Sequence, residues 1–441
     1  MGLATFKGGV HPYEGKELSM SKPVQTLEPK GELVYPLSQH IGAPAKPLVK
    51  KGDQVLAGQK IGESQGFVSA DVICSVSGTV KAVEPRMTAG GAMAMSVVVE
   101  SDGQYTAVQG FGTARDYKSL SKEEIRNAVK EAGIVGMGGA GFPTHVKLAP
   151  KDDSKIDYVI VNGAECEPYL TSDYRMMLEM PEKIVEGLKV ILQLFENAKG
   201  IIGIEANKPE AIKVLTDLVK NEPRISVCTL KTKYPQGGER TLIYAATGRK
   251  INSSMLPADV GCIVDNVGTV VAVADAVCRN IPLIQRIVTI TGDAVADPKN
   301  FLVRTGTCFQ ELVDGAGGFK EEPEKLISGG PMMGTAMFGL NVPVTKVTSA
   351  LTCFTRDTVA ANAPTACIRC GRCADVCPSH VIPQLMMEAA ERSDIDLFVK
   401  YDGMECCECG CCTYICPAKR PLTQAFREMR KVVAASRKKK A

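Results

Sequence analysis

Cysteines near the C-terminal end of the chain are the residues whose type and spacing point most directly to chemistry. Ten of the 17 cysteines lie between residues 367 and 416. Eight of them form two runs with the same spacing, C-x2-C-x2-C-x3-C-P, made of Cys367, Cys370, Cys373 and Cys377 and of Cys406, Cys409, Cys412 and Cys416. Thiolates at this spacing hold 4Fe–4S clusters. The runs therefore predict two clusters and the transfer of electrons one at a time.

The fourth cysteine of such a run usually ligates the other cluster. The expected ligand sets are Cys367, Cys370, Cys373 and Cys416 for one cluster, and Cys406, Cys409, Cys412 and Cys377 for the other. Zinc is a weaker alternative, because a zinc site rarely takes three cysteines at two-residue gaps, and buried structural cysteines would not repeat the spacing. Cys407 and Cys411 lie off the spacing, and we interpret them as packing residues beside a cluster, with a ligand role as the alternative. The seven scattered cysteines are expected in the core.

Upstream, four segments combine glycine with acidic, amide or hydroxyl side chains. They are Gly136-Met137-Gly138-Gly139-Ala140-Gly141-Phe142-Pro143-Thr144, Asn162-Gly163-Ala164-Glu165-Cys166-Glu167-Pro168, Tyr234-Pro235-Gln236-Gly237-Gly238-Glu239-Arg240 and Asp265-Asn266-Val267-Gly268-Thr269. A glycine-rich turn lets backbone N–H groups approach a phosphate without obstruction by a Cβ. The second segment follows the apolar strand predicted at 158–162, and open α/β sheets bind ligands at the carboxyl ends of their strands. Lys147 is either a further phosphate ligand or a surface lysine.

Taken together, these segments resemble the flavin-bearing, NADH-oxidising subunit of respiratory complex I and its relatives, among them the C subunit of Rnf electron transport complexes. The shared patterns are Gly-Gly-Ala-Gly-Phe-Pro-Thr, Asn-x-x-Glu-x-Glu-Pro, Gly-Gly-Glu and Asn-Val-x-Thr, in this order. The complex I subunit has Arg in place of Met137, Asp-Glu-Ser-Glu in place of residues 164–167, and a single cluster. The twin cysteine runs therefore favour the Rnf subunit, whose likeness extends over essentially the whole chain.

The resemblance implies a site residue by residue. Noncovalent FMN would be bound by Gly136, Gly138, Lys147, Asn162, Glu165, Gly237, Gly238, Asn266 and Thr269. NADH would stack on the flavin, with Gly139 near its phosphates and Phe142 beside the adenine, while Glu167 and Glu239 accept hydrogen bonds from the carboxamide and a ribose. Glu239 near a ribose hydroxyl would disfavour a 2′-phosphate, so NADH is expected rather than NADPH. The alternative role for each acid is that of a surface or helix-capping residue.

The activity that follows from the resemblance is reversible hydride exchange between NADH and FMN, then single-electron transfer through two 4Fe–4S clusters. Flavin mediates between two-electron nicotinamide and one-electron clusters, so no catalytic side chain is expected; His145 and His380 are interpreted as incidental. The expected partners are the other subunits of an ion-pumping (Na⁺ or H⁺) ferredoxin:NAD⁺ oxidoreductase, with ferredoxin as an indirect partner and no nucleic acid. The alternatives are a soluble cobalamin reductase of the same superfamily and a non-catalytic electron-transfer scaffold.

The elements that must position these residues suggest a multidomain α+β protein. Residues 1–112 are expected to form a barrel-sandwich hybrid that resembles biotinyl and lipoyl carrier domains. Residues 113–284 alternate strands with helices, among them a helix capped by Ser121 and one over 181–198, and predict a Rossmann-like α/β domain for FMN and NADH. Residues 285–350 look like a β-grasp (SLBB-like) module. Residues 351–426 are the helical ferredoxin-type 2x4Fe–4S domain, and 427–441 a basic tail.

Two of these regions carry further expectations. The carrier-like hairpin has Ala70-Asp71-Val72-Ile73 where a carrier lysine would stand, so a structural or docking role is expected instead of covalent attachment. The basic tail includes Arg427, Arg430 and Lys431, and is either a solvated end or a contact for anionic lipid or an acidic partner.

Composition limits the class of protein. The chain has 441 residues, of which 45% are apolar and 23% charged, as in soluble globular proteins. A net charge of +3 and the absence of Trp argue against nucleic acid as a partner. No apolar run is long enough to span a bilayer, and the first residues do not form a secretory signal. Iron–sulfur ligands must stay reduced, so we expect a peripheral protein on the cytoplasmic face of the cell membrane.

Overall fold

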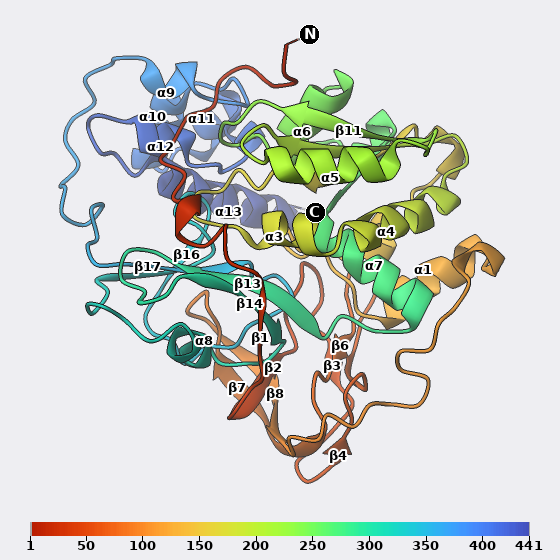
Figure 1. Cartoon of the computed structure of the whole chain (residues 1–441). Helices are drawn as coiled ribbons and strands as arrows, with labels where there is room; N and C mark the ends of the chain where they lie inside the picture. Colours follow the sequence, from red (N-terminus) through yellow and green to blue (C-terminus); the bar gives the residue numbers. More distant parts are fainter. Residues whose placement is uncertain (1, 441) are drawn as a thin grey trace.

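The computed structural model describes residues 2–440, with side chains up to residue 437. Among these residues there are four sheets, the helices packed on them and a helical C-terminal region, and the predicted mixed α and β architecture is confirmed. In Figure 1 the barrel strands lie at the bottom, the long central sheet above them, the α/β region at the upper right and the blue C-terminal helices at the upper left. Within the described residues, no helix combines the length and the apolar character needed to cross a membrane.

The barrel region is built from two small antiparallel sheets. One has the order β2 (Glu32–Pro36), β8 (Met93–Ser101), β7 (Gly78–Met87) and β4 (Gln54–Val55), and the other β3 (Lys46–Pro47), β5 (Lys60–Glu63) and β6 (Val72–Ile73). Alternate residues point inward because a strand turns successive side chains to opposite faces. Leu33, Tyr35, Val97 and Val99 are fully buried in this way. The barrel therefore has a core of its own.

The α/β region contains a four-stranded parallel sheet, as its alternating pattern predicted. Its order is β11 (Ile225–Leu230), β10 (Lys199–Glu205), β9 (Tyr158–Gly163) and β12 (Cys262–Asn266). The helices and turns around it are η2 (Tyr117–Ser119), α1 (Lys122–Glu131), α2 (Thr144–Lys147), η3 (Asp153–Lys155), α3 (Ser172–Glu179), α4 (Pro181–Leu194), α5 (Pro209–Val219), α6 (Glu239–Thr247), η4 (Pro257–Val260) and α7 (Val267–Arg279). The chain leaves β9 toward β10 and β11 and returns to β12 on the other side. The topological switch point therefore lies between β9 and β12.

Apolar side chains on both faces hold this sheet between layers of helices. Val159 and Val161 of β9 pack with α1, α4, α5 and α7, whereas Ile160 packs with α6. In α4, Ile184, Leu188 and Ile191 recur at helical spacing and are fully buried, each contributing roughly 1.5–3 kcal/mol. The predicted capping box is present, with Ser121 and Glu124 satisfying each other's backbone N–H groups. The helix predicted over 181–198 ends at Leu194, because Phe195 takes an extended conformation.

A six-stranded mixed sheet lies at the centre of the molecule. Its order is β1 (Gln25–Leu27), β14 (Lys299–Arg304), β13 (Gln285–Thr291), β17 (Ala350–Phe354), β15 (Lys325–Ser328) and β16 (Thr335–Met337), with α8 (Phe309–Gly315) packed against it. Strand β1 comes from the N-terminal end of the chain and pairs in parallel with β14. The expected β-grasp module thus gains a strand from more than 250 residues upstream.

The first residues of the chain run outside the barrel. Ala4 forms a bridge with Leu230, Val10 forms one with Tyr234, and η1 (Lys16–Leu18) follows before β1. In Figure 1 this red segment descends along the junction between the α/β region and the C-terminal helices. The division at residue 112 stays a prediction, but residues 4–27 pair with other parts of the molecule and not with the barrel sheets.

The C-terminal region is a group of short helices closed by one long helix. These are α9 (Arg372–Asp375), α10 (Pro383–Glu391), α11 (Ile395–Lys400), η5 (Gly403–Glu405), α12 (Cys411–Ile415) and α13 (Leu422–Lys440). Helix α13 packs through Phe426, Met429 and Val433. Arg427 and Arg430, which the sequence assigns to a basic tail, belong to this helix and pair with Glu408 at 3.2 and 3.0 Å. The first turns of that segment are therefore part of the packed region.

Candidate functional site

Two asparagines meet at the switch point of the parallel sheet. Asn162 lies near the end of β9 and Asn266 ends β12, and the two are partners in the strand register. Asn162 donates from Nδ2 to the carbonyl of Gly237 at 2.8 Å. Asn266 caps α7 by accepting the N–H of Gly268 at 2.8 Å. Open α/β sheets bind ligands at this position, so the fold places two of the expected FMN residues side by side at the expected edge.

The glycine-rich segment folds into a closed loop over the start of α7. Its base is closed by the N–H of Gly136 donating to the carbonyl of Phe142 at 2.8 Å. The N–H of Met137 donates to Thr269 Oγ1 at 3.0 Å. A Cβ on Gly138 would lie 3.0 Å from the Cβ of Asn266, so a side chain there would crowd the capping residue. Residues 138–140 are exposed. The loop can therefore offer backbone N–H groups next to a helix N-terminus, which suits a phosphate.

Lys147 lies below this loop and is not a free surface lysine. Its Nζ donates to the carbonyl of Val264 at 2.6 Å and pairs with Asp265 Oδ1 at 3.1 Å. Asp265 is fully buried and its Oδ2 has no hydrogen-bond partner. Burial raises the pKa of this carboxyl group, although Lys147 opposes the shift. Buried polar atoms normally have a hydrogen-bond partner, so the unpartnered Asp265 Oδ2 beside Lys147 is consistent with a polar group of a ligand binding next to it.

The Gly237-Gly238 turn closes the third side of the site. A Cβ on Gly237 would lie 3.2 Å from both the Cβ of Ala164 and Asn162 Oδ1, and one on Gly238 would lie 2.9 Å from Thr241 Oγ1. Gly238 is also the N-cap of α6, whose first residue is Glu239. Glu239 is exposed, and it lies within electrostatic reach of Lys147 and Asp265. The structure thus gathers the turn and this acid around the same carboxyl edge.

The carboxylate of Glu165 contacts the start of α3. Glu165 has a left-handed backbone, with φ of 47°, which turns its carboxylate toward that helix. There it accepts the N–H groups of Asp173 at 2.7 Å and Tyr174 at 3.3 Å, and it lies 3.9 Å from Lys16 Nζ. Burial raises its pKa to about 7. These contacts agree with helix capping, which was the alternative role expected for the acids of this segment.

Glu167 reaches the central sheet. Its Oε1 accepts the N–H of Met332 at 2.6 Å and that of Met333 at 3.2 Å, in the turn after β15. A Cβ on Gly330 would lie only 2.2 Å from Glu167 Cγ, so the turn must carry glycine there. Phe142 is half-buried at the closing end of the loop and Gly139 is exposed with open space around it. Glu167 and Glu239, the two acids expected at the nucleotide, therefore have different neighbours.

The first residue of the third glycine segment, to which the sequence assigned no role, joins this region to the second cysteine run. Tyr234 is 1% exposed and donates its hydroxyl to the carbonyl of Cys409 at 2.7 Å. Its backbone pairs with Val10 of the N-terminal segment through two hydrogen bonds, of 2.8 and 2.9 Å. The available signal was its place at the head of the Gln236-Gly237-Gly238 turn. Nothing local indicated its partner.

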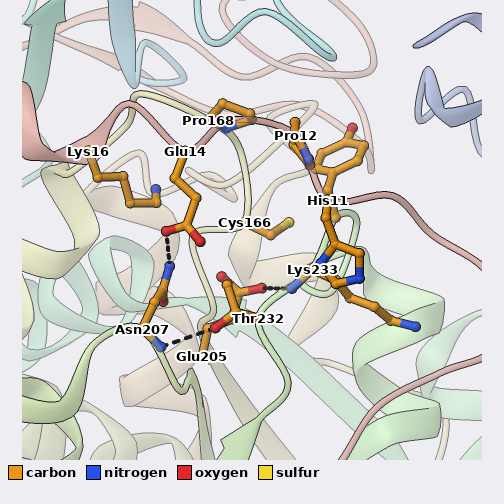
Figure 2. Close-up of a pocket in the computed structure, with 11 residues that line it drawn as sticks. His11, Pro12, Glu14, Lys16, Cys166, Pro168, Glu205, Asn207, Thr232 and Lys233 are labelled. Atoms are coloured by element: carbon orange, nitrogen blue, oxygen red, sulfur yellow. Dashed lines mark hydrogen bonds between the residues drawn. The ribbon is translucent and has the colours of Figure 1, made fainter. Parts of the chain in front are cut away.

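The N-terminal segment also covers the carboxyl ends of β10 and β11. Figure 2 shows the cavity there, lined by His11, Pro12, Glu14, Lys16, Cys166, Pro168, Glu205, Asn207, Thr232, Lys233 and Tyr234. Glu14 accepts from Asn207 Nδ2 at 2.7 Å, and Glu205 accepts the N–H of Lys233 at 3.1 Å (Figure 2). Cys166 faces the cavity and accepts the N–H of Gly237 at 3.2 Å. Tyr234 therefore lines the cavity, and Cys166 joins the cavity to the glycine turn at Gly237.

The fourth cysteine of each run lies with the other run. Burial first, and then the neighbouring thiols of Cys370 and Cys416, raises the pKa of Cys373. Burial, followed by the thiols of Cys406 and Cys377, likewise raises the pKa of Cys412 to about 12. This crossing is the one that the two expected ligand sets require.

The remaining cysteines of the two runs differ in their surroundings. Cys367 and Cys370 are exposed. Cys409 is buried beside Tyr234, and its thiol interacts with those of Cys407 and Cys411. In the described part of the chain, no three metal-binding side chains converge to hold a single metal ion. A cubane does not need that geometry, because its four thiolates surround a cluster. Six of the eight thiols, Cys370, Cys373 and Cys416 in one group and Cys377, Cys406 and Cys412 in the other, thus lie together as two 4Fe–4S clusters require, whereas the neighbours of Cys409 are Cys407 and Cys411.

Models of four known families match consecutive parts of the chain. They are described as the RnfC barrel sandwich hybrid domain (residues 4–104), the Nuo51 FMN-binding domain (129–275), the SLBB domain (287–336) and a 4Fe-4S dicluster domain (366–419). The predicted order of barrel, flavin region, β-grasp module and cluster region is confirmed by these matches.

Two curated relatives match most of the chain. The C subunit of the proton-translocating ferredoxin:NAD(+) oxidoreductase complex of Clostridium ljungdahlii is 48% identical over 87% of this chain and 84% of its own length. The C subunit of the Na(+)-translocating complex of Acetobacterium woodii is 46% identical over 99% of this chain and 98% of its own. A crystal structure of an NAD+-reducing [NiFe]-hydrogenase is similar at 21% identity, with a TM-score of 0.49, over 62% of this chain and 54% of that one.

Proposed function

Because the chain belongs to the family of C subunits of ferredoxin:NAD(+) oxidoreductase complexes, we propose that it is the part of such a complex at which electrons are exchanged with NAD(H). FMN, when bound, supplies the chemistry that links two-electron hydride exchange to one-electron transfer, which none of the side chains here can perform. The observation that carries the proposal is the meeting of Asn162 and Asn266 at the switch point, under a glycine loop and beside a glycine turn.

For the FMN phosphate and ring we propose the residues that gather at this edge. Gly136, Gly138, Asn162, Gly237, Gly238, Asn266 and Thr269 would line it, with Lys147 supplying positive charge from below. Glu165 would act on the ligand indirectly, by holding the start of α3 in place. Met137 replaces the arginine of the complex I subunit and brings no charge, which leaves Lys147 as the proposed cation of this group.

For NADH we propose the open side of the same loop. Gly139 is exposed, a Cβ on it would meet nothing within 4 Å, and Phe142 is half-buried at the end of the loop. Glu239 at the exposed start of α6 would accept hydrogen bonds from a ribose and so disfavour a 2′-phosphate. Glu167 would hold the Met332 turn in place through one carboxylate oxygen and accept a hydrogen bond from the carboxamide.

The path of electrons follows from the packing of the two cysteine runs. Cys409 of the second run is buried against Tyr234, three residues before Gly237, whereas Cys367 and Cys370 of the first run are exposed. We therefore assign Cys406, Cys409, Cys412 and Cys377 to the cluster that receives electrons first. Cys367, Cys370, Cys373 and Cys416 hold the cluster from which they leave toward a partner protein. This order of the two clusters is supported by the contact between Tyr234 and Cys409 and by the exposure of Cys367 and Cys370. It does not depend on which ion the complex pumps.

The proposed setting is the cytoplasmic face of the cell membrane, where the other subunits of the complex would hold this chain. The decisive experiment is anaerobic purification from native membranes, with subunit identification and with flavin and iron counts. Co-purification with membrane subunits, one flavin and about eight irons per chain, and NADH-dependent bleaching of flavin absorbance are expected. Purification as a lone chain that reduces cobalamin would favour the soluble reductase, and flavin absorbance unchanged by NADH would favour the scaffold.

A further inference from the structure

Residues 69–73, which stand where carrier domains attach their cofactor, are buried in this protein, although the tip of the hairpin at 65–67 is exposed. Ser69, Ala70 and Asp71 are each 1% exposed, and Val72 is fully buried. The Asp71 carboxylate pairs with Lys60 at 2.7 Å and accepts the N–H of Ser64 at 2.8 Å. A carrier group swings on an exposed residue, so these buried residues must serve another purpose. Their neighbours show which part of the molecule they support.

Lys346 joins this hairpin to the base of the glycine-rich loop. It belongs to the connection between β16 and β17 and is 1% exposed. Its Nζ donates to the carbonyl of Asp71 in the barrel and to the carbonyl of Gly133, which precedes the loop, at 2.7 Å. Its backbone N–H donates to Gln39 Oε1 at 3.1 Å. One side chain thus connects its own module with two regions that lie more than 200 residues away in the sequence.

Gly133, just before the glycine-rich loop, and Gly141, near its end, lie so close to the barrel and to the segment of Lys346 that only glycine fits. Gly133 has φ of 64°, and a Cβ there would lie 2.5 Å from the Asp71 carbonyl oxygen and 2.7 Å from Lys346 Nζ. Gly141 has φ of 73°, and its Cβ would lie 2.8 Å from Val347. The carbonyl of Gly141 accepts the N–H of Ile41, from the barrel, at 3.3 Å. The exposed residues 138–140 make no hydrogen bond in the described structure, so the anchored residues on either side of them set the position of the loop.

We propose that Lys346 is a positioning residue for nucleotide binding: it ties the barrel hairpin to the glycine-rich loop, so that the barrel acts as a fixed support for that loop. The identity of the ligand rests on the proposed function, whereas the link between the barrel and the loop rests on the hydrogen bonds of Lys346. Arg286 makes a parallel contact from the same module, because its Nη2 donates to the carbonyls of Met137 at 3.4 Å and Thr348 at 3.1 Å. The barrel and the central sheet thus hold the loop from two sides.

The test replaces Lys346 by methionine, which keeps nearly the length of the side chain and removes its donors. We expect the KM for NADH to rise about tenfold with kcat for an artificial acceptor nearly unchanged, since a loose loop loses binding in ground and transition states alike. Hydrogen exchange of the protein without NADH gives a second readout. The amides of residues 134–142 should exchange faster in the variant, while iron and flavin contents stay at wild-type values.

Two matched controls separate positioning from general loss of stability. Lys299→Met removes another buried lysine, the first residue of β14, which pairs with Asp297 and does not touch the loop. The second control, Gly248→Ala, strains a left-handed glycine that has open space around it. It is matched to a second test variant, Gly141→Ala, which should reproduce the effect of Lys346→Met and can replace that variant if it fails to fold. Both controls should leave KM and loop exchange unchanged.

The proposal is overturned if Lys346→Met and Gly141→Ala leave loop exchange and KM at the values of the two controls. A wild-type protein that does not react with NADH would instead contradict the proposed function. In that case faster loop exchange in Lys346→Met would still support the link between the barrel and the loop, and unchanged exchange would still refute it.

Discussion

Tyr234 donates its phenolic hydrogen to the backbone carbonyl of Cys409 across 2.7 Å, in a place where the tyrosine is 1% exposed. The bond joins the turn that carries Gly237 and Gly238 to the cysteine run that we assign to the first electron acceptor. The N-terminal segment closes the same junction, because Val10 pairs with the backbone of Tyr234 and the N–H of Gly9 donates to the carbonyl of Val376 at 2.8 Å. The flavin and cluster regions are thus fastened at a buried point and cannot be regarded as loosely tethered domains.

Replacing Tyr234 by phenylalanine should weaken that junction. The variant leaves the Cys409 carbonyl without its buried donor, which costs about 1–3 kcal/mol. We expect a lower unfolding temperature and slower bleaching of cluster absorbance after NADH is mixed in, with the rate of flavin reduction unchanged. Tyr13→Phe is the control, because Tyr13 is exposed and bonds only to the nearby Glu17. Equal cluster reduction in the two variants would rule out this role for Tyr234.

Cys370→Ala should remove one cluster and spare the nucleotide site. Cys370 is exposed and belongs to the outer ligand set, so its loss should lower the iron content from about eight to about four per chain. Flavin reduction by NADH should persist, as measured by stopped-flow absorbance. Loss of flavin reduction together with the cluster would mean that the two centres do not assemble independently.

Cys407→Ala and Cys411→Ala test the alternative that one of these off-spacing cysteines is a ligand. As packing residues beside Cys409, they should retain about eight irons per chain and both electron paramagnetic resonance signals. A variant with half the iron would identify a ligand and revise the second set.

Glu167→Gln should slow the reaction with NADH. The amide oxygen can still accept the N–H of Met332, so the turn after β15 should keep its position while the negative charge is lost. We expect a reduced rate of flavin bleaching by NADH with iron content near eight per chain, roughly the count that two cubanes imply. Glu131→Gln, at an exposed site of the α/β region, provides the control. An NADH rate equal to that of the wild type would contradict the assigned role.

Lys346 should also make stability depend on pH. Burial lowers the pKa of its ammonium group to about 7 from an ordinary value near 10.5, and the Asp71 carboxylate only partly opposes this. The unfolded chain therefore binds more protons than the folded one between these values, so this group makes the fold more stable as pH rises from about 7 to 10.5.

The measurement is the difference in unfolding temperature between the wild type and Lys346→Met across that range of pH. Other titrating groups, including His40 and the Lys60–Asp71 pair beside Lys346, are common to both proteins. The unfolding temperature of the wild type should rise relative to that of the variant as the pH rises. A difference that stays constant would show that Lys346 titrates normally in the folded protein.

Much of the fold was predictable because its signals are local. The strand at 158–163, the Ser121 capping box and the amphipathic α4 follow from residues at most a few turns apart. The part of the site at the switch point was also predictable. Asn162 lies near the end of a buried strand of a parallel sheet, and such strands end at the carboxyl edge, where ligands bind. The strand that the N-terminal segment adds to the central sheet was missed, because Gln25–Leu27 carries no pattern that names its partner.

The sequence by itself determined the chemistry: the duplicated spacing of eight cysteines specifies the type of cluster, and the glycine and asparagine segments specify a nucleotide edge. Only the tertiary structure decided which residues support that chemistry. In it Glu165 accepts N–H groups at the start of α3, Tyr234 bonds to Cys409, 175 residues away, and Lys346 bonds to Asp71, 275 residues away. The physical reason is that ligand spacing is a property of a short chain segment, whereas a buried hydrogen bond depends on where distant segments meet.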